Sequence, residues 1–110
     1  MIASMLLLIA APQAVPATGV ADSAQIEEIV IIGRRAGGVR WDWNVDKAGR
    51  LTKCKITRSS GDREIDQIGC EATRQCAARG VRKARPMRNC IIPLRRHLIA
   101  ELARRRVAGK

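Results

Sequence analysis

The chain has 110 residues, which is enough for one small domain and excludes a second. Hydrophobic residues make up 46% of it, but there is no Phe or Tyr and there are only two Trp, so its apolar core must be thin and needs covalent support. The net charge of +11 lies entirely in residues 74–110, which hold twelve Lys or Arg and one Glu, and this asymmetry indicates an anionic partner or a solvated basic face.

Residues 1–21 have the pattern of an export signal. The apolar run Met5–Ala11 is followed by small residues, with cleavage sites after Ala17 or Ala21. This run is shorter than the roughly 20 apolar residues that a membrane-spanning helix needs. We therefore predict a signal peptide over residues 1–21 and a periplasmic or secreted location for the rest of the chain.

Residues 22–38 are predicted to form an N-terminal strand and a linker. The β-branched run Ile29–Ile32 has high strand propensity and is stopped by Gly33 and two arginines. The flexible segment Arg34–Gly38 would let Glu27–Ile32 fold back antiparallel beside Trp41–Val45 as a third strand of the sheet. The alternatives are a plain linker and a segment offered to another protein. The predicted partner-binding residues are Ile29, Val30, Ile31 and Ile32.

Residues 39–78 are predicted to form a compact unit of two strands and one helix. Trp41, Trp43 and Val45 alternate with polar residues, which is typical of a half-buried strand. Gly49 suits a hairpin turn, after which residues 50–58 return as the second strand. The segment Ser59–Asp62 then ends the strand and offers a helix cap. The helix that follows has an apolar stripe made of Ile65, Ile68, Gly69, Ala72 and Cys76.

Residues 79–110 are predicted to form a basic loop and a C-terminal helix. Gly80 and Pro86 favour a loop, and residues 93–107 favour a helix with Pro93 in its first turn. Clustered arginines attract polyanions, and in an envelope compartment anionic lipid or lipopolysaccharide is favoured over nucleic acid. The predicted anion-binding residues are Arg95, Arg96, Arg104, Arg105 and Arg106. The alternative is a basic face that is merely solvated.

Four cysteines in a short exported chain predict two disulfides. They are Cys54, Cys70, Cys76 and Cys90, and their spacing allows three connectivities. Helical spacing alone directs Cys76 toward the sheet, because it shares the stripe of Ile65, and places Cys70 on the flank. A metal site is the competing interpretation. Zinc sites favour cysteine pairs separated by two to four residues, and this chain has no such pair, so we predict no metal and no cofactor.

The sequence contains no arrangement typical of a catalytic site. Its one histidine, His97, lies among arginines and is most simply a surface residue. Ser59 and Ser60 have no base nearby in the sequence and are better explained as turn and cap residues. We therefore predict that the protein is not an enzyme.

The residues 41–76 carry a resemblance to a known family. The motifs WxV, GRL, CKITRSSGDREID and GCEAT occur in the order seen in the C-terminal domain of TonB-type energy transducers. The positions that resemble the family are Gly49, Ser59, Ser60, Gly61, Ile65 and Asp66. Some periplasmic members carry one cysteine in the strand and one in the helix, so the resemblance implies a Cys54–Cys70 bridge and leaves Cys76 to pair with Cys90.

The resemblance also implies a way of binding. The run IEEIVIIGRR is similar to the segment of TonB-dependent outer-membrane receptors that pairs, in extended form, with the transducer's C-terminal domain. The chain departs from the family in lacking the usual third strand, which begins with an aromatic residue and a proline.

Together these patterns predict an α+β fold. A small antiparallel sheet, with the N-terminal segment as its third strand, packs on one helix, and a basic C-terminal helix and two disulfides complete the domain. The predicted function is a small periplasmic protein-binding or adaptor module that accepts an extended strand of an envelope protein. The alternative is a secreted cationic protein that binds anionic envelope surfaces.

Overall fold

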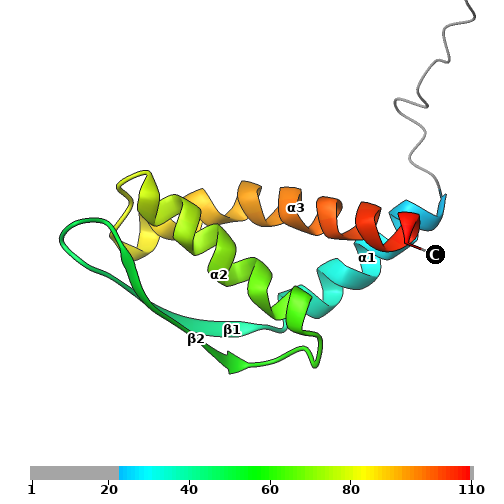
Figure 1. Ribbon diagram of the computed structural model, residues 1–110, viewed down its shortest axis with the longest axis horizontal. Coiled ribbons are helices and arrows are strands. Elements are labelled where there is room, and N and C mark those ends of the chain that lie inside the picture. The colour runs from blue at the N-terminus through cyan, green and yellow to red at the C-terminus, as the bar shows by residue number, and fades with distance from the viewer. Residues whose placement is uncertain (1–22, 110) are drawn as a thin grey trace, which may run out of the picture.

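The computed structural model describes residues 23–109, so the predicted signal peptide over residues 1–21 lies outside the described residues. Figure 1 shows a hairpin on one side of a central helix and two further helices on the other side. The central helix, Arg63–Ala78, contacts every other element. The backbone of neither strand comes close to the C-terminal helix, Ala84–Ala108. In chain order the elements are α1 (Ser23–Gly37), β1 (Arg40–Val45), β2 (Leu51–Arg58), α2 (Arg63–Ala78) and α3 (Ala84–Ala108).

The hairpin forms where alternating polar and apolar residues predict it. β1 and β2 are antiparallel, with Trp41 opposite Ile56 and Trp43 opposite Cys54. In the turn the Asp46 carboxylate accepts hydrogen bonds from two backbone N–H groups, each at 2.9 Å, and Gly49 takes a positive φ of 79°. Within residues 23–109 the sheet has only these two strands, so each strand keeps one unpaired edge.

The start of α2 is held by two aspartates. The Asp62 carboxylate is the N-cap and accepts from the backbone N–H groups of Glu64 at 3.1 Å and Ile65 at 3.3 Å. Asp66 is buried and accepts from the Ser59 hydroxyl and from both the backbone N–H and the hydroxyl of Ser60, the last two at 2.7 Å. The serines that end β2 therefore also fix the first turn of α2.

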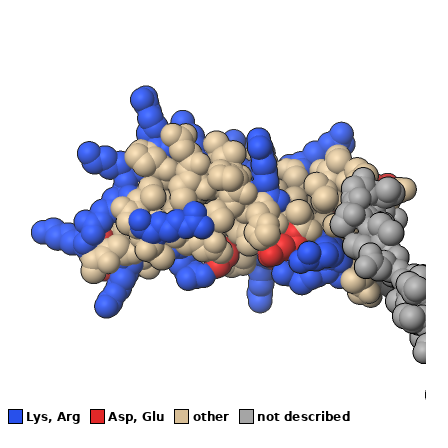
Figure 2. Space-filling model, turned by 90° about the horizontal axis from the view of Figure 1, so that it is seen from above, with Lys and Arg blue, Asp and Glu red and all other residues tan. Residues whose placement is uncertain are grey.

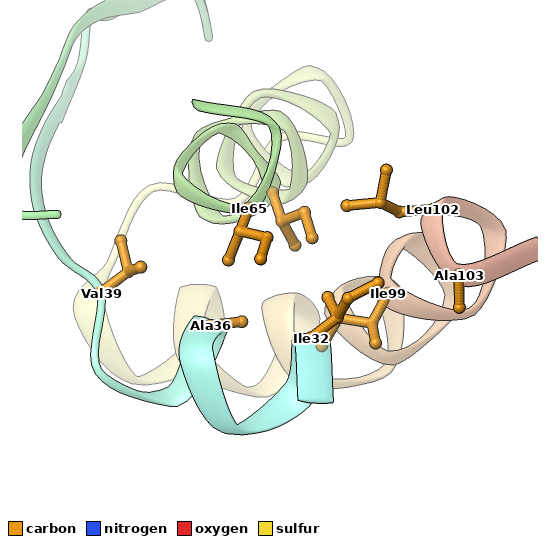
Figure 3. Close-up of a cluster of buried hydrophobic side chains, with 8 residues drawn as sticks. Ile32, Ala36, Val39, Ile65, Ile99, Leu102 and Ala103 are labelled. Atoms are coloured by element: carbon orange, nitrogen blue, oxygen red, sulfur yellow. The ribbon is translucent and has the colours of Figure 1, made fainter. Parts of the chain in front are cut away.

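The main core lies where α1, α2 and α3 meet. Figure 3 shows Ile32 and Ala36 of α1 pointing toward Ile65 of α2 and Ile99 of α3. A second cluster joins α2 to the N-terminal half of α3 and is covered from the sheet side by the two tryptophans; its buried members are Ala72, Cys76, Ala77, Met87 and Ile91. The predicted stripe of α2 is buried throughout.

The predicted N-terminal strand is wrong, because residues 29–32 lie inside helix α1. Ile29, Ile32 and Ala36 are spaced at three and four residues, so they form one apolar face only in a helix. Ile32 is fully buried, Ala36 is 3% exposed, and Ile29 packs against the same cluster. Burial of that face outweighs the modest strand preference of β-branched residues, which tertiary packing often overrides.

The C-terminal helix is longer than predicted. It begins at Ala84, so Pro86 lies in its first turn rather than in a loop, and Pro93 lies in its interior rather than at its start. An interior proline removes one backbone hydrogen bond and costs about 3 kcal/mol. The segment before Pro93 stays helical because Met87 and Ile91 are buried in the core cluster shared with α2, with exposed fractions of 1% and 7%. In addition, a disulfide joins Cys90 to Cys76 of α2.

Two disulfides join the elements, as the resemblance implied. Cys54–Cys70 links β2 to α2, and Cys76–Cys90 links α2 to α3. Structural disulfides persist in oxidising compartments, so both are consistent with a secreted or periplasmic protein. Among residues 23–109, no helix has both the length and the apolar character that crossing a membrane requires.

Candidate functional site

A groove of about 530 Å³ runs between β1 and α3. Its sheet side is formed by Arg40, Trp41 and Trp43, and no residue of β2 contributes to it. Its helix side combines Arg88 and Arg95 with an apolar wall made of Met87, Ile91 and Ile92. The groove therefore places both tryptophans of the chain and three arginines around one opening.

Trp41 is held in the groove by contacts with α2. Its indole Nε1 donates to the Thr73 hydroxyl at 3.0 Å, and that hydroxyl donates to the Gly69 carbonyl at 2.7 Å. The ring lies directly against Gly69, where an added Cβ would approach Trp41 carbons to 2.7–2.8 Å. Gly69 of the predicted stripe is therefore required, because the Trp41 ring lies too close for any side chain at that position. This close packing fixes the position of Trp41 in the wall of the groove.

The groove carries uncompensated positive charge. Arg40 donates to the carbonyls of Gly37 at 3.1 Å and Val39 at 3.2 Å, which keeps its guanidinium at the end of β1. Arg95 is partly buried, and burial, followed by repulsion from Arg40, lowers its pKa below the usual arginine value. No Asp or Glu lines the groove. An anionic group placed there would therefore be stabilised by charge.

The groove lies beside an unpaired edge of the sheet. β2 occupies one side of β1, and within residues 23–109 no strand occupies the other side. The backbone of β1 does not come close to α3, and the groove lies between the two elements. Unpaired edge strands offer a row of N–H and C=O groups to any extended chain that can reach them.

The five predicted anion-binding arginines do not form one site. Arg95 lies in the groove, whereas Arg106 donates to both carboxylate oxygens of Asp62, at 2.9 and 2.7 Å. The Arg105 guanidinium lies 3.8 Å from the Glu64 carboxylate, and Arg96 and Arg104 are exposed on α3. In Figure 2, Lys and Arg side chains project along the whole of the visible face, so positive charge is spread over it.

The pairing of Arg106 with Asp62 is structural. Burial acts to raise the pKa of the Asp62 carboxyl, but the hydrogen bonds from Arg106 and from the backbone of Ile65 outweigh it, so the pKa lies below its ordinary value. The pair joins the last turns of α3 to the N-terminus of α2. Arg106 is thus engaged in holding the fold together.

The predicted partner-binding residues are also separated. Ile32 is fully buried and Ile29 packs on the core, whereas Val30 and Ile31 are 46% and 45% exposed on the outside of α1. The segment cannot act as an extended strand while α1 is formed. Val30 and Ile31 alone remain available at the surface.

Arg40 and Arg88 line the groove but were not among the predicted site residues. One signal could have identified the α3 wall of the groove: the helical spacing of Ala84, Arg88, Ile91 and Arg95. It becomes apparent once residues 84–92 are assigned to the helix.

Comparisons of this chain with protein-family models, with curated proteins and with solved structures found no match.

Proposed function

We propose that this protein is a small, non-catalytic periplasmic module that binds an extended segment of another protein along the free edge of β1. The observation that carries the proposal is the coincidence of an unpaired strand edge with a groove that is aromatic, apolar and basic. Strand addition supplies main-chain hydrogen bonds, and pockets for alternate side chains supply specificity. The resemblance of residues 41–76 to the TonB C-terminal domain supports the same mode of binding.

The side chains of the groove define the partner segment. Trp41 and Trp43 offer apolar surface to every second residue of an added strand. Arg40, Arg88 and Arg95 favour carboxylates, since no acidic residue of the groove competes for them. We infer a partner segment that alternates aliphatic and acidic residues.

The alternative function is binding to an anionic envelope surface. The observation in its favour is that Arg96 and Arg104 are exposed on α3 outside the groove, and that Ile92, at the edge of the groove one turn before Arg96, is 45% exposed. Cationic residues with an apolar neighbour are typical of a surface that binds anionic lipid. This surface uses arginines that lie outside the groove, so variants can distinguish the two functions.

The experiment is a fluorescence titration, because both tryptophans of the chain line the groove. The probe is a peptide of alternating Glu and Val, and its control is the same peptide methylated at alternate backbone nitrogens, which keeps the charge but removes main-chain donors. We expect the Glu-Val peptide to change the emission and the methylated peptide to bind at least about tenfold more weakly, which is 1.4 kcal/mol.

Matched arginine variants complete the test. Arg95→Gln and Arg104→Gln remove one charge each from the same helix, but only Arg95 lies in the groove. The proposal expects Arg95→Gln to weaken peptide binding about tenfold and Arg104→Gln to weaken it less than about twofold. Equal losses, together with binding to phosphatidylglycerol vesicles that depends on Arg96 and Arg104, would support the alternative function instead.

A further inference from the structure

Helix α1 presents a second, unpartnered face on the side opposite the core. Glu27, Val30, Ile31 and Arg34 are spaced at three, four and seven residues, so they form one seam along the helix. All four are exposed, whereas Ile32 on the other side is fully buried. Two β-branched side chains thus lie at the centre of the seam, with an acid at one end and a base at the other.

Within residues 23–109 the seam meets another element only at one flank, where Glu27 and Ile31 line a shallow pocket with Val107 of α3, and Val30 and Ile31 stay 46% and 45% exposed. The side chains of Glu27 and Arg34 make no hydrogen bond or ion pair with any residue in the range 23–109. A Cβ added at the neighbouring Gly33 would meet no atom within 4 Å, so the adjoining flank of the helix is open as well. Glu27 and Arg34 are therefore exposed charges on either side of an apolar centre, and neither has a charged partner among residues 23–109.

The order of residues in the seam is self-complementary. When two such helices lie antiparallel about a two-fold axis between residues 30 and 31, Glu27 of each copy faces Arg34 of the other. In the same arrangement Val30 of each copy packs on Ile31 of the other. A parallel arrangement would instead place Glu27 against Glu27, which is unfavourable. Closed two-fold contacts of this isologous kind are the commonest in soluble homo-oligomers.

We propose that α1 is an interface between two copies of this chain, paired antiparallel through Glu27, Val30, Ile31 and Arg34. One helix face buries little surface compared with standard protein interfaces, so the dimer is weak and depends on concentration. Its charges set the direction of pairing more than its strength. None of the four residues lines the groove between β1 and α3, so pairing leaves that groove free.

The test is a charge swap measured by sedimentation equilibrium of the full, oxidised chain over a range of concentrations. Glu27→Arg and Arg34→Glu each place like charges opposite one another, and we expect each to weaken association at least about fivefold. Arg34→Glu lowers the net charge, so general repulsion alone would make it associate more strongly. The two variants thus separate a specific contact from the effect of net charge.

Two rescues complete the design. The double variant Glu27→Arg/Arg34→Glu restores both pairs, so its association should return to within about twofold of the original chain. An equal mixture of the two single variants should form a heterodimer, because one copy then carries a base at both ends of the seam and the other copy carries an acid at both ends. Each base faces an acid across that interface, so neither like-charge contact of the single variants remains.

Three outcomes would overturn the proposal: a chain that is monomeric at all concentrations, a double variant that stays dissociated, or an Arg34→Glu variant that associates normally. Far-ultraviolet circular dichroism of each variant checks that α1 is intact.

Discussion

Two stretches of the chain are rich in β-branched residues, yet one forms helix α1 and the other forms strand β2. In α1 the run Ile29–Ile32 is continuous, and burial selects Ile29 and Ile32 while leaving Val30 and Ile31 exposed. In β2, Cys54 and Ile56 are partly buried while the intervening Lys55 is exposed. The first pattern has the period of a helix and the second has the period of a strand.

In these two segments the spacing of the buried positions decides whether a helix or a strand forms, and residue type does not. A continuous apolar run fits both periods, so propensity alone favours a strand. The helical period becomes apparent only when Ala36, one turn further along the helix, is counted with Ile29 and Ile32 as members of a single buried face. In β2 the interruption by lysines leaves only the two-residue period.

The largest expected effect comes from breaking the buried side of α1. Ile32→Ala removes a fully buried side chain and should lower the free energy of unfolding by about 2–5 kcal/mol. Ile31→Ala removes an identical side chain that is 45% exposed, so it should change that free energy by less than about 1 kcal/mol. Urea unfolding of both variants measures the difference. Equal effects at Ile29 and Ile31, with little effect at Ile32, would indicate the two-residue period of a strand and contradict the helix.

The next effect concerns the bridge that ties β2 to α2. Removal of Cys54–Cys70 by Cys54→Ser/Cys70→Ser opens a closed loop with a sequence separation of 16 and should cost about 3 kcal/mol. The single variant Cys54→Ser should leave one thiol, at Cys70, reactive toward a maleimide. Peptide mapping of the label checks this pairing. A label on Cys76 or Cys90 would show a different connectivity.

A smaller effect is expected where β1 packs on α2. Gly69→Ala places a methyl group where the Trp41 ring lies, and the ring cannot retreat without losing its hydrogen bond to Thr73. Overpacking of this kind costs about 1–3 kcal/mol. Thermal unfolding measures the loss, and Gly33→Ala in the open flank of α1 is the matched control. If Gly69→Ala melts at the same temperature as that control, the close packing of Trp41 on α2 is refuted.

The smallest effect concerns the junction where β2 ends and α2 begins. Hydrogen bonds from the Ser59 hydroxyl, and then from the backbone and hydroxyl of Ser60, hold the pKa of Asp66 below the ordinary 3.8. A carboxyl with a lowered folded-state pKa stabilises the fold above its unfolded pKa, and this stabilisation is lost as the pH falls through the folded value. The melting temperature should therefore drop below about pH 4, and less steeply in Asp66→Asn. Identical slopes would contradict the assignment.

Much of the hairpin and of α2 could be predicted from the sequence, because the relevant signals are local. The alternation around Trp41, the glycine turn and the Ser59–Asp62 cap each report on neighbouring residues. The pairing of Cys54 with Cys70 came from the family resemblance, since spacing left three connectivities open. The helical state of α1 was missed because the face made of Ile29, Ile32 and Ala36 is masked by a continuous apolar run. The early start of α3 depends on contacts with α2, a segment distant in the sequence.

The groove could not be predicted for the same reason. Arg40 and Arg95 are far apart in the sequence and meet because α3 extends past Pro93 along the open side of β1. The predicted set of tail arginines followed sequence proximity instead. It therefore combined Arg95 of the groove with Arg106, which holds α3 to α2 through Asp62.

The most direct test of strand addition at β1 is backbone hydrogen exchange with and without the alternating Glu-Val peptide. We expect saturating peptide to slow exchange at alternate residues of β1, Arg40–Val45. Exchange in β2, Leu51–Arg58, should stay unchanged, because β2 does not border the groove. Bound peptide that leaves every amide of β1 exchanging at its original rate would contradict it.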